Sequence, residues 1–135
     1  MQAPAGKRFS LRERMCSFSF AFKGIATAVS TQHNFRIHLV AFVLVIAAAV
    51  IFGISPFEWC IVLLASALVL SLEIVNTAFE FLVDMVSPQY QEKAGRIKDL
   101  AAAAVLVAAI LAAAAGLIVF TKYILVFFST SSVIR

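Results

Sequence analysis

The sequence predicts an all-α integral membrane protein, in which an N-terminal amphipathic helix lies in the membrane interface and three transmembrane helices follow. Of the 135 residues, 63% are hydrophobic, and the mean hydropathy is +1.02, whereas soluble domains contain about 45–50% apolar residues. The apolar residues gather in three long runs, which glycine, proline and polar residues separate. Six of the eleven Lys and Arg residues precede the first run.

The segment before the first apolar run divides into two parts. Residues 1–8 offer little to bury, so we expect them to be disordered. Residues 9–35 are predicted to form one amphipathic helix, because apolar side chains recur at three- and four-residue spacing. This apolar stripe consists of Met15, Phe18, Phe22, Ile25 and Val29. Such a helix lies in the interface and turns its basic residues toward the lipid headgroups.

The three apolar runs predict membrane-spanning helices over residues 37–54, 57–86 and 99–121. Residues 87–98 are polar and follow the pattern of a loop, which Pro88 begins. We therefore expect one membrane-embedded domain over residues 9–128, with a tail at 129–135.

The positions of Lys and Arg predict the orientation in a cell membrane. The N-terminal segment and the 87–98 loop are basic, whereas the short turn after the first span carries neither residue type. The positive-inside rule then places the N-terminus and this loop in the cytoplasm and the C-terminus outside. Basic and aromatic residues do not alternate as a nucleic-acid surface would require, so we expect no nucleic-acid partner.

A polar stripe marks the second half of the second span. At about 100° per residue, the four side chains fall within an arc of about 80°. They are Glu73, Asn76, Glu80 and Asp84. Ionisable groups inside a span are costly and indicate a functional site. The competing interpretation is a hydrogen-bonded seam between helices, but three acids without interleaved bases make a poor seam.

The residues at the cytoplasmic end of this stripe can support phosphoryl transfer. Carboxylates and carboxamides bind Mg²⁺, while Lys98 and other cations can neutralise phosphate oxygens. Glu73 is the deepest acid and could accept the proton of a lipid hydroxyl. The chain has no GxxxxGK[ST] or GxGxxG motif. A proton- or cation-coupled carrier therefore remains an alternative, as does a non-catalytic membrane assembly factor. His33 and His38 are interpreted as interfacial anchors.

Four segments resemble the small prokaryotic diacylglycerol/undecaprenol kinases, over about residues 18–120. They are Phe22-Lys23-Gly24, the Asn34–His38 segment, the ExxNxxxExxxD pattern from Glu73 to Asp84, and Gly95-Arg96-Ile97-Lys98-Asp99 with the alanines after it. The resemblance implies an integral membrane lipid kinase that uses ATP and Mg²⁺ and assembles as a homotrimer.

The resemblance also implies roles for individual residues. Glu73 matches the catalytic base, and Asn76 the asparagine beside it. Glu80 matches a metal-binding glutamate that also serves the nucleotide, and Lys98 with Asp99 match the pair that holds ATP. The looser matches to the ATP-binding loop are Gln89, Tyr90 and Gln91, and those to the lipid-substrate contacts are Lys23, Phe35 and Arg36, beside Glu73.

One position departs from the family pattern. The family usually has a second metal-binding glutamate where this chain has Gln32. A carboxamide oxygen can still bind Mg²⁺, without the charge of a carboxylate, so Gln32 is predicted as a metal and ATP ligand. The acceptor is expected to be undecaprenol or diacylglycerol. The Asn-x-Arg-Ile-His and Ser-Pro-x-Tyr segments favour the undecaprenol branch.

Overall fold

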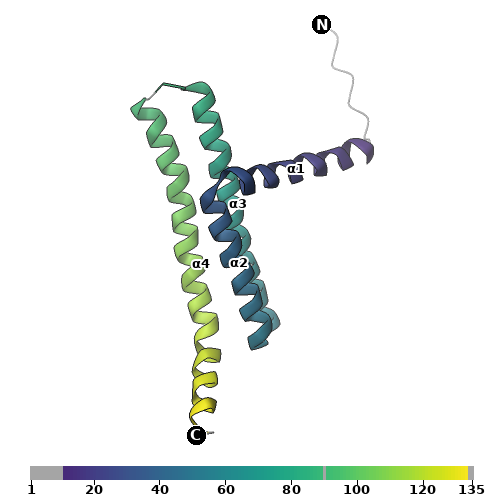
Figure 1. Ribbon diagram of the computed structural model, residues 1–135, viewed down its shortest axis with the longest axis vertical. Coiled ribbons are helices and arrows are strands. Elements are labelled where there is room, and N and C mark those ends of the chain that lie inside the picture. The colour runs from purple at the N-terminus through teal and green to yellow at the C-terminus, as the bar shows by residue number, and fades with distance from the viewer. Residues whose placement is uncertain (1–10, 90, 134–135) are drawn as a thin grey trace.

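A computed structural model of the chain describes residues 11–89 and 91–133, and its regular structure is entirely α-helical. The helices are α1 (Leu11–Thr31), α2 (His33–Phe52), α3 (Pro56–Val86) and α4 (Glu92–Val133). Helices α2, α3 and α4 lie lengthwise beside one another, and α1 projects to one side (Figure 1). The all-helical prediction is confirmed. Residues 1–8, predicted to be disordered, lie outside the described part.

Three of these helices are long and apolar enough to cross a membrane. They are α2, α3 and the Glu92–Phe127 part of α4, and 18-residue windows within them have mean hydropathies of 2.5, 2.1 and 2.8. Most of their large apolar side chains are exposed on the single chain. The prediction of three helices that are able to span a membrane is confirmed, and hydrocarbon is the natural surrounding of such an apolar surface.

The first helix ends earlier than the predicted 9–35 helix. Gln32 takes an extended conformation, with φ −107° and ψ 116°, and separates α1 from α2. Its backbone still accepts from the Arg36 N–H and donates to the Ala28 carbonyl. A single residue therefore turns the chain from the side-projecting helix into the first span.

The turn between α2 and α3 follows the sequence closely. Gly53 has φ 62°, and the N–H groups of Gly53 and Ile54 satisfy carbonyls of the last turn of α2. Ser55 then caps α3: Ser55 Oγ accepts from Glu58 N–H, and Glu58 Oε2 accepts from Ser55 N–H. Pro56 occupies the first helical turn, where its missing N–H is not needed.

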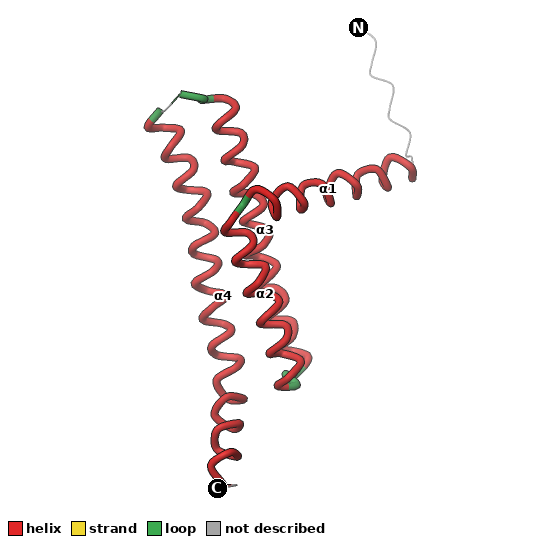
Figure 2. The backbone as a smooth tube through the Cα atoms, viewed as in Figure 1, coloured by secondary structure: helices red, strands yellow, loops and turns green. Residues whose placement is uncertain are grey.

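The connection between α3 and α4 is much shorter than the predicted 87–98 loop. Helix α4 begins at Glu92, and a short connection joins it to α3 (Figure 2). Glu92, Lys93 and Ala94 are good helix formers, and an acid in the first turn suits the helix dipole. Helix α4 also continues through residue 133, well beyond the predicted end at 121.

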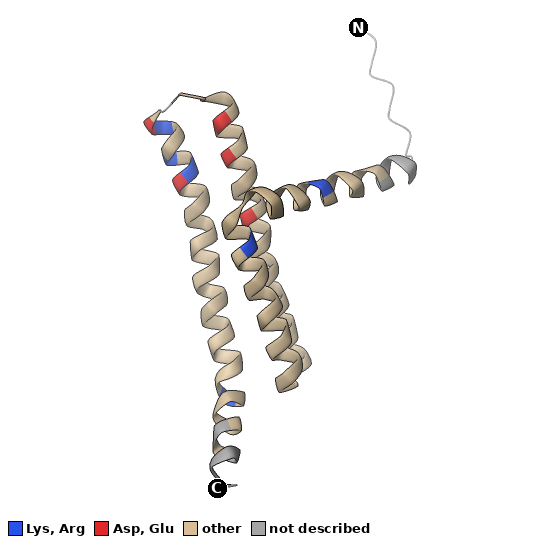
Figure 3. Ribbon diagram, in the orientation of Figure 1, with Lys and Arg blue, Asp and Glu red and all other residues tan. Residues whose placement is uncertain are grey.

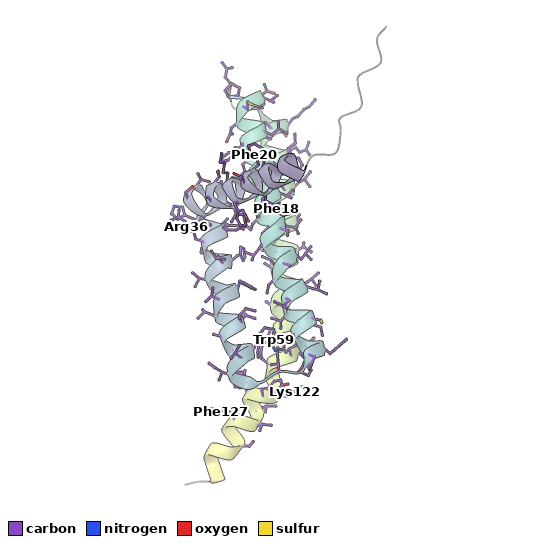
Figure 4. All side chains as sticks on the ribbon, turned by 90° about the vertical axis from the view of Figure 1, so that its right-hand side faces the viewer. Phe18, Phe20, Arg36, Trp59, Lys122 and Phe127 are labelled. Atoms are coloured by element: carbon purple, nitrogen blue, oxygen red, sulfur yellow. The ribbon has the colours of Figure 1, made fainter. Side chains whose placement is uncertain are left out.

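A charged clamp joins α3 and α4 at the end where α3 begins. Glu58 Oε2 accepts a hydrogen bond of 2.7 Å from Tyr123 Oη, and Glu58 Oε1 lies 2.6 Å from Lys122 Nζ. Phe52 stacks on Tyr123 beside them, and Figure 4 labels Trp59 and Lys122 in this region. An apolar cluster that includes Ala49, Ile54, Val62 and Val119 packs in the same region. The clamp fixes the distance between the two long helices.

Candidate functional site

The polar stripe lies on α3, and its burial falls along the helix. Glu73 is 3% exposed and Asn76 7%, while the Asp84 side chain is 64% exposed. Acidic and basic residues gather toward the end of the bundle where α3 meets α4 (Figure 3). The predicted stripe thus runs from a buried acid outward to the polar end of the span.

Two amides hold the carboxylate of Glu80. Asn76 Nδ2 donates to Glu80 Oε1 at 2.9 Å, and Gln32 Nε2 donates to Glu80 Oε2 at 3.1 Å. The first contact follows from the i, i+4 spacing on one helix. The second joins positions 48 residues apart and depends on the break at Gln32 between α1 and α2. The tertiary structure therefore brings together three of the predicted site residues.

Glu73 meets a residue that the sequence analysis assigned elsewhere. His38 Nε2, on α2, lies 3.3 Å from Glu73 Oε1, and the His38 side chain is 26% exposed. The interpretation of His38 as a simple interfacial anchor is incomplete, because its ring faces the buried acid. His33 is exposed on the same helix. In the sequence, both histidines share the same signal, an ionisable ring at the start of a span. Only the packing of α2 against α3 shows that His38, and not His33, lies beside Glu73.

Thr77 was also missed. It is 5% exposed, and its hydroxyl donates to the Glu73 carbonyl at 2.9 Å. This bond satisfies the hydroxyl within the helix and leaves the Glu73 carboxylate to other partners.

The predicted ATP ligands that the structure describes lie where α3 connects to α4, and they differ in their contacts. Lys98 Nζ forms a salt bridge with Asp84 Oδ1, which gives Asp84 a partner that sequence reasoning did not assign. Asp99 is exposed on the first turns of α4, and Gln89 and Gln91 are exposed on the connection. Tyr90 lies outside the described residues.

The predicted lipid contacts are spread around the junction of α1 and α2. Phe35 is buried, at 3% exposure, whereas Arg36 is exposed and its Nε donates to the Gln32 carbonyl at 3.4 Å. Lys23 is exposed on α1, with Nζ 5.6 Å from the centre of the Phe20 ring. Figure 4 labels Arg36 near the junction. Only Phe35 of these three is packed into the protein.

Two cavities flank the stripe. One of about 370 Å³ lies between α3 and α4 and is lined by Asn76 among apolar residues such as Leu72 and Phe79. The other, of about 570 Å³, lies between α2, α3 and α4 and is lined by His38 and mainly apolar residues. The smaller cavity therefore touches the stripe through Asn76, whereas the larger one is lined by His38, the neighbour of Glu73, and by no residue of the stripe.

The oxygen atoms of Glu80 and its two amide neighbours suit a hard cation that also keeps ligands from outside the protein, such as phosphate oxygens and water. Asn76 Oδ1 is buried and has no hydrogen-bond partner, and the Glu80 carboxylate lies beside it. Gln32 adds a carboxamide. In the described part of the chain, no three His, Cys, Asp or Glu side chains converge on a metal position. Mg²⁺ is commonly held by one or two carboxylates together with phosphate oxygens and water, so these three residues could hold it with a phosphate ligand.

Fold and site together define an integral membrane protein with a buried acid on its central helix and oxygen ligands beside it. The family described as prokaryotic diacylglycerol kinase matches residues 19–120 of this chain. The chain belongs to that family, whose name is that of a lipid kinase. The resemblance stated from its motifs is confirmed.

Individual relatives carry two related names. A diacylglycerol kinase from Synechocystis is 44% identical over 70% of this chain, and the match spans 54% of that protein. The undecaprenol kinase of Bacillus subtilis is 36% identical over 77% of this chain and 85% of its own length. The diacylglycerol kinase of Escherichia coli K12 is 33% identical over 66% of this chain and 73% of its own. This chain thus spans about half the length of the Synechocystis relative.

Proposed function

We propose that the protein is a lipid kinase that transfers the γ-phosphate of ATP to the hydroxyl of a membrane lipid, undecaprenol or diacylglycerol. One observation carries this proposal: a buried acid, Glu73, lies one helical turn from Asn76 and two from Glu80, and Gln32 contacts Glu80 from the α1–α2 junction. Family membership supports the same class of reaction.

Glu73 is the general base in this proposal. Its burial, at 3% exposure, keeps it out of competition with bulk water, and the proposed acceptor hydroxyl reaches it near the headgroup boundary. The hydroxyl proton passes to Glu73 as the oxygen attacks the γ-phosphorus. The bond to the β,γ-bridging oxygen breaks, and ADP keeps that electron pair.

Glu80, Asn76 and Gln32 would hold Mg²⁺ together with the ATP phosphates. When bound, the cation would neutralise phosphate charge. The unpartnered Oδ1 of Asn76 supports this assignment, since a buried polar atom needs a partner. Lys98 and Asp99 bind the nucleotide at the α3–α4 end, and Gln89, Tyr90 and Gln91 contribute from the connection.

The proposed setting is a cell membrane, with the N-terminal segment and the α3–α4 connection on the cytoplasmic side where ATP is available. The basic residues of these segments support this orientation. Helix α1 lies in the interface, where its exposed Phe18 and Phe22 meet lipid and Lys23 meets headgroups. Lys23, Phe35 and Arg36 then border the acceptor lipid. We also propose assembly into a homotrimer, as the family resemblance implies, which the mass of the purified complex would test.

The test is transfer of labelled γ-phosphate from MgATP by the purified protein in mixed micelles. Undecaprenol and diacylglycerol are offered in parallel, with Glu73→Gln as the comparison variant. We expect one of the lipids to be labelled. We also expect Glu73→Gln to reduce the rate by at least about 10³-fold while the protein stays folded, because an amide cannot accept the proton.

The ratio of the two labelled lipids assigns the acceptor. Full turnover by Glu73→Gln would overturn the role of Glu73. Absence of labelled lipid with both acceptors would overturn the kinase proposal. The carrier alternative would then be tested by measuring flux into vesicles without ATP.

A further inference from the structure

The contact between His38 and Glu73 is the feature of the site that neither the motif nor the proposed reaction uses. It joins α2 to α3 through His38 Nε2 and Glu73 Oε1, 3.3 Å apart. The acid is 3% exposed and the ring 26% exposed. The partly exposed His38 ring therefore separates the buried Glu73 carboxylate from the outside of the α2–α3 pair.

A buried carboxylate needs a partner, because an ionised group without one is strongly disfavoured in an apolar interior. The Thr77 hydroxyl serves the Glu73 backbone and not its carboxylate. The neighbouring acid Glu80 acts on Glu73 with the same sign of charge. In the part of the chain that the structure describes, the side-chain contact to the Glu73 carboxylate comes from His38.

The direction of this contact follows from the chemistry of the two groups. A carboxylate that acts as a base is ionised and only accepts, so the hydrogen must lie on His38 Nε2. The contact then occupies Glu73 Oε1 and leaves Oε2 for the acceptor hydroxyl. Because the contact comes from a different helix, it also fixes the direction of the carboxylate relative to α2.

His38 also connects the acid to the larger cavity. It lines the space of about 570 Å³ between α2, α3 and α4, whose walls include Phe42, Val62 and Phe120. Glu73 is absent from the walls of both cavities described above. An apolar molecule in the larger cavity therefore meets His38 before it meets the acid.

We propose that His38 is a positioning residue for the base Glu73: it holds Oε1 and directs Oε2 toward the acceptor hydroxyl. This inference rests on the proposed lipid kinase function. The proton of the hydroxyl goes to Glu73, and His38 keeps its own proton throughout. His38 touches neither the phosphate nor the nucleotide.

The test compares His38→Leu with His38→Gln, whose amide can donate from a similar position. His33→Leu is the matched control, because His33 is exposed on the same helix and away from Glu73. We expect His38→Leu to lower kcat about 10- to 100-fold, as a misplaced reacting group does. The KM for MgATP should stay within about twofold of the wild-type value, since uniform binding is not affected. His38→Gln should recover most of kcat.

A second measurement follows the acid without using activity. Dicyclohexylcarbodiimide modifies protonated carboxyl groups in apolar surroundings, and mass spectrometry locates the product. Without its partner the buried Glu73 should take up a proton, so His38→Leu should be modified at Glu73 several times faster than wild type. His38→Gln and His33→Leu should react at close to the wild-type rate.

Two results would overturn the positioning role: His38→Leu with the kcat of His33→Leu, or unchanged modification of Glu73 in His38→Leu. A wild-type protein that labels no lipid would instead overturn the proposed function. The modification experiment would still decide, in that case, whether His38 controls Glu73. The two failures are thus distinguishable.

Discussion

At the scale of single residues, the chemistry depends on which groups surround Glu80. A neutral donor, Gln32, meets one carboxylate oxygen and Asn76 meets the other. Both amides also carry an oxygen, so each can turn from donor to ligand when a cation arrives. The hydrogen bonds described for the Glu80 carboxylate are thus both donated by neutral amides.

The Gln32→Glu variant should make the fold depend on the cation. It replaces a hydrogen bond, of about 1 kcal/mol in typical cases, with two like charges in contact. We expect a lower melting temperature than wild type without Mg²⁺ and a larger rise in melting temperature when Mg²⁺ is added. Binding of Mg²⁺ should tighten by about tenfold, or about 1.4 kcal/mol.

Differential scanning fluorimetry across a MgCl₂ titration measures both effects. Asn34→Asp serves as the control, because it adds one charge on an exposed position of α2 without touching Glu80. Equal Mg²⁺ responses of the two variants would argue against a cation at Glu80.

At the scale of elements, the junctions between helices decide where the site residues lie. The break at Gln32 carries its side chain to Glu80, and the early start of α4 brings Lys98 to Asp84. Had residues 87–98 formed a loop, the positions of Lys98 and Asp99 would not be fixed by helix geometry. The positions of the two proposed nucleotide ligands therefore depend on a helical Glu92–Lys98 segment.

Substitution of Gly95 tests that segment. Gly95 lies in α4, and a Cβ added there meets nothing within 4 Å. Gly95→Ala should raise the free energy of unfolding by about 0.5–1 kcal/mol, because alanine favours a helix over the unfolded chain. Gly53→Ala should lower it by about 1 kcal/mol, since Gly53 has φ 62° at the end of α2. Denaturant unfolding in detergent measures both changes. A loss of stability in Gly95→Ala would contradict a helical start of α4.

At the scale of the whole molecule, the two ends of the helix bundle carry different groups of polar residues. One end carries the stripe, the Lys98–Asp84 pair and the α1–α2 junction. The other carries the Glu58–Tyr123–Lys122 clamp, in which Glu58, in the first turn of α3, contacts two residues of α4. Glu58 and Glu73 are separated by about 22 Å along α3, at 1.5 Å per residue. The clamp can therefore hold the helices together without entering the chemistry.

The orientation of these two ends can be tested with cysteine labelling. Single Phe57→Cys and Gln89→Cys variants are made after replacement of the exposed Cys16 and Cys60 by alanine. Phe57 is 75% exposed at the α2–α3 turn, and Gln89 is exposed at the α3–α4 connection. A membrane-impermeant maleimide should label Phe57→Cys in intact spheroplasts, and Gln89→Cys only after permeabilisation. The reverse pattern would invert the proposed topology.

The sequence by itself determined the three spans and the stripe from Glu73 to Asp84. Both are local properties, since apolar run length predicts a span and an i, i+3, i+4 pattern predicts a face. The Asn76–Glu80 hydrogen bond follows from the same spacing. The family resemblance follows from residue identity along four segments of the chain.

Only the tertiary structure decided which partners meet this stripe. The Gln32–Glu80 and His38–Glu73 contacts join different helices, and their formation depends on a one-residue break and on the packing of α2 against α3. The polar residues 87–98 were predicted to be a loop, and the start of the last helix was therefore expected too late in the chain. Outside the membrane, a polar sequence can form a helix as well as a loop. Long-range contacts are set by how helices pack, and hydropathy along the chain carries no record of that packing.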